Sequence, residues 1–192
     1  MSSSTSSHAL LASLRAAFSG RMVSDPAEMA PWLRDYRQRW GGPALAVVQP
    51  DSTADVAAVV RWCVDHDAVV VPQGGNTGLT GASVPLADPH PTPHPEAQPA
   101  SADKAPPDAP DPSQAQAAGR ADAPCHPVIL LSLSRMQQVR SVDALASTMV
   151  VEAGCTLQAA QEAAAAHGRL FPLSLASEGS CTSAATWPAG CG

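Results

Sequence analysis

A glycine-rich stretch directly after a short β-branched run constrains this chain more than any other feature. The run at 69–71 is all valine, Pro72 and Gln73 follow it, and glycines then stand at 74, 75, 78 and 81. Glycine accepts backbone conformations with φ > 0 and lets a ligand approach without meeting a Cβ atom. Successive backbone N–H groups in such a loop can form a concave anion site. The stretch therefore predicts a strand and then a loop that holds phosphate or pyrophosphate.

The spacing of these glycines excludes two common phosphate motifs. It contains no G-x-G-x-x-G dinucleotide fingerprint, and no Gly-Lys-Ser/Thr follows it as in a Walker A loop. Gly81 and Pro85 also interrupt any following helix. We therefore expect loop amides to hold the anion, with side-chain hydrogen bonds from Asn76, Thr77 and Thr80. From the glycines alone, a hairpin that binds nothing remains the alternative.

The residues before the loop have a β-α-β pattern. Residues 44–48 form an apolar run, Ser52 is placed to cap a helix over 53–66, and 68–71 form a second apolar run. This order predicts a parallel pair of strands with a right-handed crossover. The glycine loop then follows the carboxyl end of the second strand, where α/β sheets commonly bind ligands. The helix should face the core with Val56, Val59, Val60 and Cys63.

Two further helices are expected nearer the N-terminus. Residues 8–18 have apolar side chains at helical spacing, and Gly20 can end that helix. Asp25-Pro26-Ala27-Glu28 combines an N-cap, a proline in the first turn and a glutamate at N3. The second helix is expected to carry Met29, Trp32, Leu33 and Tyr36 on one face. The arginines at 34, 37 and 39 are then expected on its solvated face, with phosphate contact as the alternative.

Residues 88–127 differ in composition from the rest. They hold eleven of the chain's nineteen prolines, and they lack the apolar residues needed to offset the entropy cost of folding. We expect a disordered insert. His90 and His94 lie four apart but not on a predicted helix, so with Cys125 and His126 they are not expected to form a metal site.

Regular structure is expected again after the insert. Strands are predicted over 128–133, 138–142 and 148–151, the last two as an antiparallel pair. A helix over 156–167 is expected to be capped by Thr156 and closed by Gly168. Residues 171–180, Phe-Pro-Leu-Ser-Leu-Ala-Ser-Glu-Gly-Ser, form a second loop without periodicity.

Three of these stretches, in this order, resemble one protein family. They are Val-Pro-Gln-Gly-Gly-Asn-Thr-Gly-Leu-Thr-Gly-Ala-Ser-Val-Pro (71–85), the strand and turn at 128–136, and the run from 148 to 180. They are similar to FAD-linked oxidases with the p-cresol methylhydroxylase/vanillyl-alcohol oxidase fold, in the branch of D-lactate, glycolate and D-2-hydroxyglutarate dehydrogenases. The resemblance covers about residues 20–182 apart from the insert. It implies an α+β fold of two subdomains, a small β-α-β subdomain and part of a second mixed α/β subdomain, incomplete at its C-terminus.

The resemblance also implies a cofactor and its contacts. FAD is expected to lie with its pyrophosphate on the glycine loop and its flavin along the second loop. No histidine or cysteine occurs at 73–81, so the FAD is expected to be non-covalent. The implied FAD-binding residues are Pro72, Gln73, Gly74, Gly75, Asn76, Thr77, Gly78, Leu79, Pro172, Leu173, Ala176, Ser177, Gly179, Ser180 and Thr182.

The resemblance stops after Thr182. The family continues Ile-Gly-Gly-Asn-Leu-Ala, whereas this chain reads Ser-Ala-Ala-Thr-Trp-Pro over 183–188. Removing the first base from ATC GGC GGC AAC CTG GCC yields codons for those six residues, so we hypothesise a one-base frameshift and an aberrant tail over 183–192. The family's catalytic histidines and substrate-binding basic residues lie further on. No catalytic residue is therefore assigned here, and a small 2-hydroxy acid is expected as a partner only with the missing domain. An inactive fragment or non-catalytic binding module is the alternative.

Composition sets limits on partners and compartment. The net charge is −6 with no basic run, so nucleic acid is not an expected partner. No apolar run is long enough for a membrane span. Five cysteines without a C-x-x-C pair indicate reduced thiols in a cytoplasmic protein. Residues 1–24 contain serines, Arg15 and Arg21 but no acid, and would also suit a mitochondrial presequence.

Overall fold

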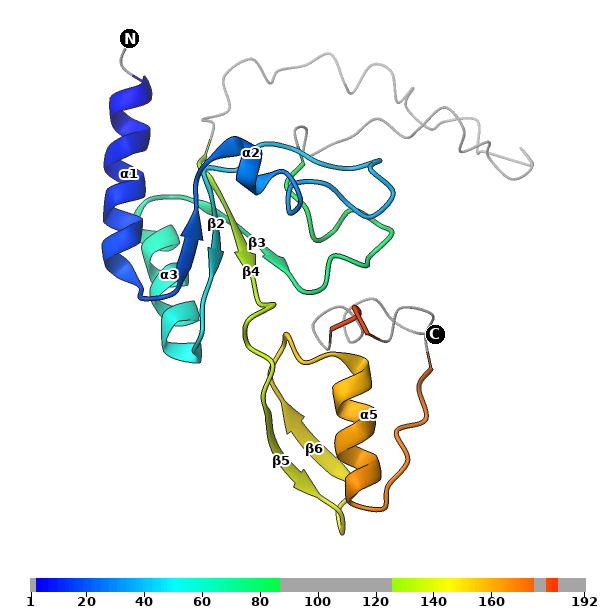
Figure 1. The fold of residues 1–192 in the computed structure, drawn as a ribbon. Coiled ribbons are helices and arrows are strands. Elements are labelled where there is room, and N and C mark those ends of the chain that lie inside the picture. Colours follow the sequence, from blue (N-terminus) through cyan, green and yellow to red (C-terminus); the bar gives the residue numbers. More distant parts are fainter. Residues whose placement is uncertain (1–2, 87–125, 175–178, 183–192) are drawn as a thin grey trace, which may run out of the picture.

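A four-stranded mixed sheet forms the larger of two lobes in the computed structural model, which describes residues 3–86, 126–174 and 179–182. Its strand order is β1-β2-β4-β3 (Figure 1). β2 (Ala46–Gln49), β4 (Val128–Ser132) and β3 (Val69–Gln73) run parallel, and β1 (Arg21–Val23) pairs antiparallel with β2. The carboxyl ends of the three parallel strands therefore meet at one edge.

Alternation along the strands divides the core of this lobe between the two faces of the sheet. Ile129 and Leu131 pack with α1 (Ser3–Ala17) and α3 (Thr53–Asp65), where Leu14 and Val59 are fully buried. Leu130 lies in a second cluster with Val23, Val47 and Met29, the last residue of α2 (Pro26–Met29). β4 is thus covered on both faces of the sheet, as parallel strands usually are.

The smaller lobe is a hairpin covered by one helix. β5 (Val139–Asp143) and β6 (Thr148–Val151) are antiparallel, and α5 (Leu157–Ala166) contacts β5. The Thr156 side chain accepts a hydrogen bond from the Ala159 amide, and Gly168 after the helix has φ +66°. The predicted hairpin, N-cap and closing glycine are all confirmed.

Two arginines connect the smaller lobe to the start of α3. Nη2 of Arg140 lies 3.0 Å from Thr53 Oγ1 and 3.1 Å from Glu152 Oε1. Arg135 pairs with Asp51. A hydrogen bond from the Gln138 amide and the charge of Arg140 lower the pKa of Glu152, so this carboxylate stays ionised at neutral pH.

The second predicted helix is shorter than expected. Asp25 caps it as predicted, accepting from the amides of Ala27 and Glu28, but the helix ends at Met29. Pro31 has no N–H for a further helical hydrogen bond. The Asp35 carboxylate then accepts from the amides of Arg37 and Trp40, and so stabilises a turn. The expected helix face through Tyr36 is wrong, since the helix ends before it and Tyr36 is 77% exposed. Arg34, Arg37 and Arg39 therefore do not share a helix face.

Two details of the β-α-β unit also differ from expectation. β2 and β3 are parallel, but β4 lies between them and pairs with both. The backbone of β4 is therefore hydrogen-bonded along both edges. Its residues Ile129, Leu130 and Ser132 are fully buried. On α3, Val60 is 40% exposed, and Trp62 is buried in its place.

Several sequence predictions concern other parts of the chain. The proline-rich insert, apart from His126 and Pro127, and the tail over 183–192 lie outside the described residues. So do Cys125 and Cys191. The three described cysteines, Cys63, Cys155 and Cys181, are buried and free.

Candidate functional site

The glycine loop begins where β3 ends, and Gln73 anchors its first turn. This side chain is 1% exposed. Its Nε2 donates to the carbonyl oxygens of Trp32 and Ser83, each at 2.9 Å. Gln73 therefore fixes the path of the loop through its side chain. The sequence implied only that it lies beside the cofactor.

Gly75 is the point at which the second loop meets the first. Its backbone N–H donates to Thr182 Oγ1 at 3.0 Å. A Cβ atom at position 75 would overlap the carbonyl oxygen of Ser180. Only glycine allows the backbone of 179–182 to approach this closely, so the two predicted loops are in direct contact.

The segment at 179–182 is held in turn by the start of α5. The Leu157 amide donates to the Cys181 carbonyl at 2.9 Å, and Thr156 and Thr182 form an isolated β-bridge. Cys181 and Thr182 are buried, whereas Gly179 and Ser180 are exposed. The smaller lobe thus supplies the surface that closes on Gly75.

Asn76 ties the loop to the turn after α2. Its φ is +53°, a left-handed conformation that asparagine tolerates better than most residues. Its Nδ2 donates to the Arg34 carbonyl at 2.7 Å, and its Oδ1 accepts from Ser83 Oγ at 3.4 Å. The side chain therefore acts within the protein as a brace for the loop.

The outer part of the loop remains open. A Cβ atom at Gly78 would find only Ser83 Oγ within 4 Å, at 3.9 Å. Leu79 is 50% exposed, Pro72 is exposed, and Gly74 and Thr77 are half-buried. A glycine-rich backbone open to solvent fits a pyrophosphate held by loop amides.

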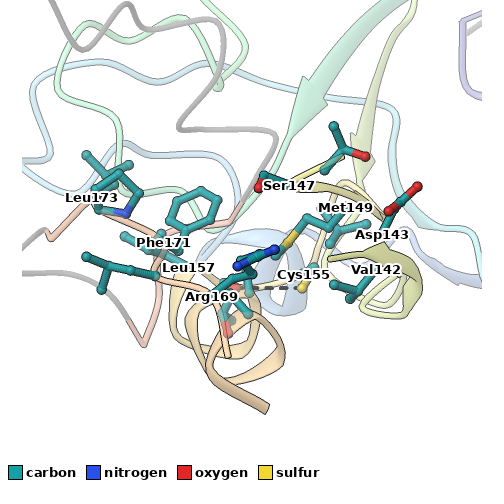
Figure 2. A pocket seen from close by; sticks show the side chains of 16 residues that line it. Val142, Asp143, Ser147, Met149, Cys155, Leu157, Arg169, Phe171 and Leu173 are labelled. Atoms are coloured by element: carbon teal, nitrogen blue, oxygen red, sulfur yellow. Dashed lines mark hydrogen bonds between the residues drawn. The ribbon is translucent and has the colours of Figure 1, made fainter. Parts of the chain in front are cut away.

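Pro172 and Leu173 lie elsewhere, on an apolar cavity of the smaller lobe. This cavity of about 610 Å³ is enclosed by the β5–β6 hairpin, α5 and residues 169–173. Figure 2 shows Phe171 and Leu173 toward one end of it and Asp143 toward the other. Cys155 also lines the cavity, and burial, aided by the charge of Glu152, raises the pKa of its thiol. The second loop therefore contacts two places, the cavity through 172–173 and the glycine loop through 179–182.

Sequence reasoning missed the residues that brace the loop. Trp32, Arg34 and Ser83 accept from loop side chains, all three through their backbone carbonyls, and a carbonyl contact has no residue-type signature. Ala176 and Ser177, also implied as FAD-binding, lie outside the described residues.

Neither a metal cluster nor a membrane-spanning helix occurs in the described part of the chain. Over residues 3–86, 126–174 and 179–182, no three His, Cys, Asp or Glu side chains are grouped to hold a metal ion. The helices in those ranges are too short or too polar to cross a membrane. His90, His94 and Cys125 lie outside these ranges.

Comparison with known families assigns this fold to the flavin-binding domains. The sequence model of the FAD binding domain family matches residues 44–88 and 115–192. The chain belongs to this family, which confirms the resemblance seen in the glycine loop, and FAD is its cofactor.

Relatives place the chain near one group of dehydrogenases. It is 30% identical over 175 residues to the mitochondrial D-2-hydroxyglutarate dehydrogenase of Bos taurus, covering 89% of this chain and 24% of the relative. It is 30% identical over 162 residues to D-2-hydroxyglutarate dehydrogenase of Xanthomonas citri, covering 84% and 26%. The chain thus spans about a quarter of the length of these relatives.

Solved structures share the fold at low identity. An alkyldihydroxyacetonephosphate synthase superposes with a TM-score of 0.64 at 14% identity, over 92% of this chain and 28% of that one. p-Cresol methylhydroxylase superposes with a TM-score of 0.53 at 14% identity, over 84% and 25%. The expected p-cresol methylhydroxylase-type fold is confirmed.

Proposed function

We propose that this chain is the FAD-binding portion of a flavin-dependent 2-hydroxy-acid dehydrogenase. FAD binds without a covalent bond, with its pyrophosphate on the loop over Gly74–Leu79. The contact between Gly75 and Thr182 carries the proposal, because it brings together the two loops expected to hold the cofactor. FAD supplies hydride chemistry, and the protein supplies binding and orientation.

The substrate class is proposed from the relatives. Those at 30% identity are named for D-2-hydroxyglutarate, so the proposed substrate is a small D-2-hydroxy acid. Oxidation of such an acid needs a base near the reacting carbon and a cation for the carboxylate. We propose that both come from sequence corresponding to the part of the relatives that this chain does not match.

The packing of helix α1 bears on whether residues 1–24 act as a cleaved mitochondrial presequence. Leu14 is fully buried and Phe18 is 8% exposed in the core of the larger lobe. Cleavage of residues 1–24 as a presequence would remove these side chains and β1 from the fold. We therefore propose that this segment is retained, although several relatives are named as mitochondrial.

Flavin binding by the purified chain tests the proposal. We expect a yellow protein whose FAD is released by denaturation, and an apo form that binds added FAD. Gly78→Val should abolish that binding, and Ala82→Val, at an exposed position in the same segment, is the control. A folded but colourless chain without affinity for FAD would favour the alternative of a binding module for another ligand.

A further inference from the structure

The smaller lobe is joined to the sheet of the larger lobe by one short connection, residues 133–138 between β4 and β5. It lies at the edge of the sheet where β2, β3 and β4 end (Figure 1). The lobe contacts this edge at the glycine loop, through Gly75 and Thr182, and at the start of α3, through charged side chains. A lobe held by a single connection can turn about it, so these contacts decide its position.

The start of α3 is negatively charged. Asp51 precedes the N-cap Ser52, and Asp55 lies in the first turn of the helix. The Ser52 hydroxyl, and then the amide and hydroxyl of Ser19, donate to the Asp55 carboxylate and lower its pKa. Two carboxylates therefore face outward from the point where the helix begins.

The facing part of the smaller lobe is positively charged. Arg135, in the connection, pairs with both carboxylate oxygens of Asp51. Arg140, on β5, reaches the helix itself, since its Nη2 lies 3.0 Å from Thr53 Oγ1. The guanidinium planes of these two arginines thus connect one lobe to the other, and their charge complements that of the helix start.

Glu152 directs Arg140 toward the helix. Its side chain is only 9% exposed. One carboxylate oxygen accepts from the Gln138 amide at 2.9 Å, and the other lies 3.1 Å from Arg140 Nη2. The carboxylate is therefore fixed at the base of the hairpin, and it holds the guanidinium in the position from which it reaches Thr53.

We propose that these charged contacts form a latch, which seats the smaller lobe and so sets how firmly the 179–182 segment closes on Gly75. The latch consists of Asp51, Thr53, Arg135, Arg140 and Glu152. Its arginines are positioning residues, because they belong to neither of the two loops proposed to hold FAD. The coupling to FAD rests on the proposed function, whereas closure on Gly75 does not.

Salt sensitivity distinguishes the latch from ordinary packing. Solvent-exposed ion pairs are screened by salt, and the Debye length falls from about 30 Å in 0.01 M salt to about 3 Å in 1 M salt. Raising the KCl concentration over about this range should make hydrogen exchange at the Gly75 amide of the apo protein about two- to fivefold faster, as expected for exposed pairs. Arg140→Gln should exchange rapidly at both salt concentrations.

Two further sets of variants make the comparison specific. Arg169→Gln is the control, since this arginine of the smaller lobe donates to the Ala144 carbonyl within its own lobe, and it should exchange as the wild type does. Asp51→Arg and Arg135→Asp should each accelerate exchange at Gly75. The double variant restores an ion pair of opposite direction, so it should recover the slow exchange.

Dissociation of FAD from the same variants tests the coupling. It should be several-fold faster in Arg140→Gln and in each single charge reversal, and it should recover in the double variant. Equal Gly75 exchange in Arg140→Gln and Arg169→Gln, or no recovery in the double variant, would overturn the latch. Faster exchange with unchanged FAD dissociation would overturn the coupling. A wild-type chain that binds no FAD would overturn the proposed function, and the exchange rates would still decide the latch. Thermal unfolding confirms that each variant is folded.

Discussion

The backbone amide of Gly75 and the hydroxyl of Thr182 are hydrogen-bonded at 3.0 Å although 107 residues separate them. Gly75 belongs to the loop after β3, and Thr182 belongs to a segment held by α5. The bond therefore joins the two lobes at the proposed cofactor site. The geometry of that site therefore depends on how the smaller lobe packs against the glycine loop, and not on the loop alone.

The two central glycines of the loop should respond differently to a methyl group. In Gly75→Ala the new Cβ meets the Ser180 carbonyl, so we expect the 179–182 segment to be displaced and the melting temperature to fall. In Gly78→Ala the Cβ enters open space and φ is not left-handed, so the apo protein should keep its melting temperature. FAD affinity should fall in both variants.

Differential scanning fluorimetry with and without FAD distinguishes the two effects. Gly81→Ala provides a comparison in which the strain has another source, since Gly81 has φ +75° and its Cβ would meet Trp40. Equal melting temperatures of the Gly75→Ala and wild-type apo proteins would contradict the close approach of Ser180.

Removing the Thr182 hydroxyl should loosen the contact between the lobes. Thr182→Val keeps the shape of the side chain but leaves the Gly75 amide without this acceptor, at a cost of about 1 kcal/mol in the free energy of unfolding. Thr182→Ser keeps the acceptor and should be close to the wild type. Hydrogen exchange at the Gly75 amide is the specific measurement, and it should be faster in Thr182→Val alone. Unchanged exchange would show that this bond does not form in solution.

Much of the fold was predictable because local signals agree with it. Ser52, Asp25 and Thr156 each cap a helix as their spacing indicates, and the hairpin at 139–151 forms around the turn that its residues at 143–147 indicate. The position of β4 between β2 and β3 was not predictable in this way. Strand order depends on which buried strand packs most favourably at the centre, and periodicity along the chain does not contain that information.

The site was predictable in part for a similar reason. The glycines revealed the loop, because their lack of a Cβ atom is visible in the sequence. The inward direction of the Gln73 and Asn76 side chains was not visible, since it depends on backbone carbonyls of Trp32 and Arg34. The early end of the helix at Met29 was also not visible, because the amphipathic spacing continues through Tyr36.

Stability at alkaline pH should depend on Cys63. Burial raises the pKa of this thiol from 9.0 to about 11, so the folded state holds the proton more tightly than the unfolded state. Its contribution to stability is complete below pH 9 and is lost as the pH rises through about 11. Urea unfolding between pH 8 and pH 11 measures this. Cys63→Ala should be less stable at pH 8 and should lose less stability across the range. Parallel curves for the two proteins would contradict the assigned burial of the thiol.

The 192-residue polypeptide by itself should not turn over D-lactate, glycolate or D-2-hydroxyglutarate, even when loaded with FAD. Proton abstraction needs a base within hydrogen-bonding reach of the substrate. Within the described ranges, Nδ1 of His66 lies 2.8 Å from the Trp62 carbonyl, and Nδ1 of His167 lies 2.9 Å from the Ala163 carbonyl. His126 pairs with Asp67 at 3.1 Å. His8 is exposed on α1, and none of these four histidines lies in the loops at 74–79 and 179–182.

Reduction of a dye acceptor, with each hydroxy acid in turn, measures this activity. The matched comparison tests the hypothesised frameshift: it is a longer polypeptide in which codon 183 is placed in the family reading frame and the sequence that follows in that frame is included. We expect turnover only from the longer polypeptide, with similar FAD affinity in both, because the loops at 74–79 and 179–182 are common to them. Turnover by the 192-residue chain above the rate of free FAD would require a base among its own residues. Substituting the six histidines one at a time would then be the way to find it.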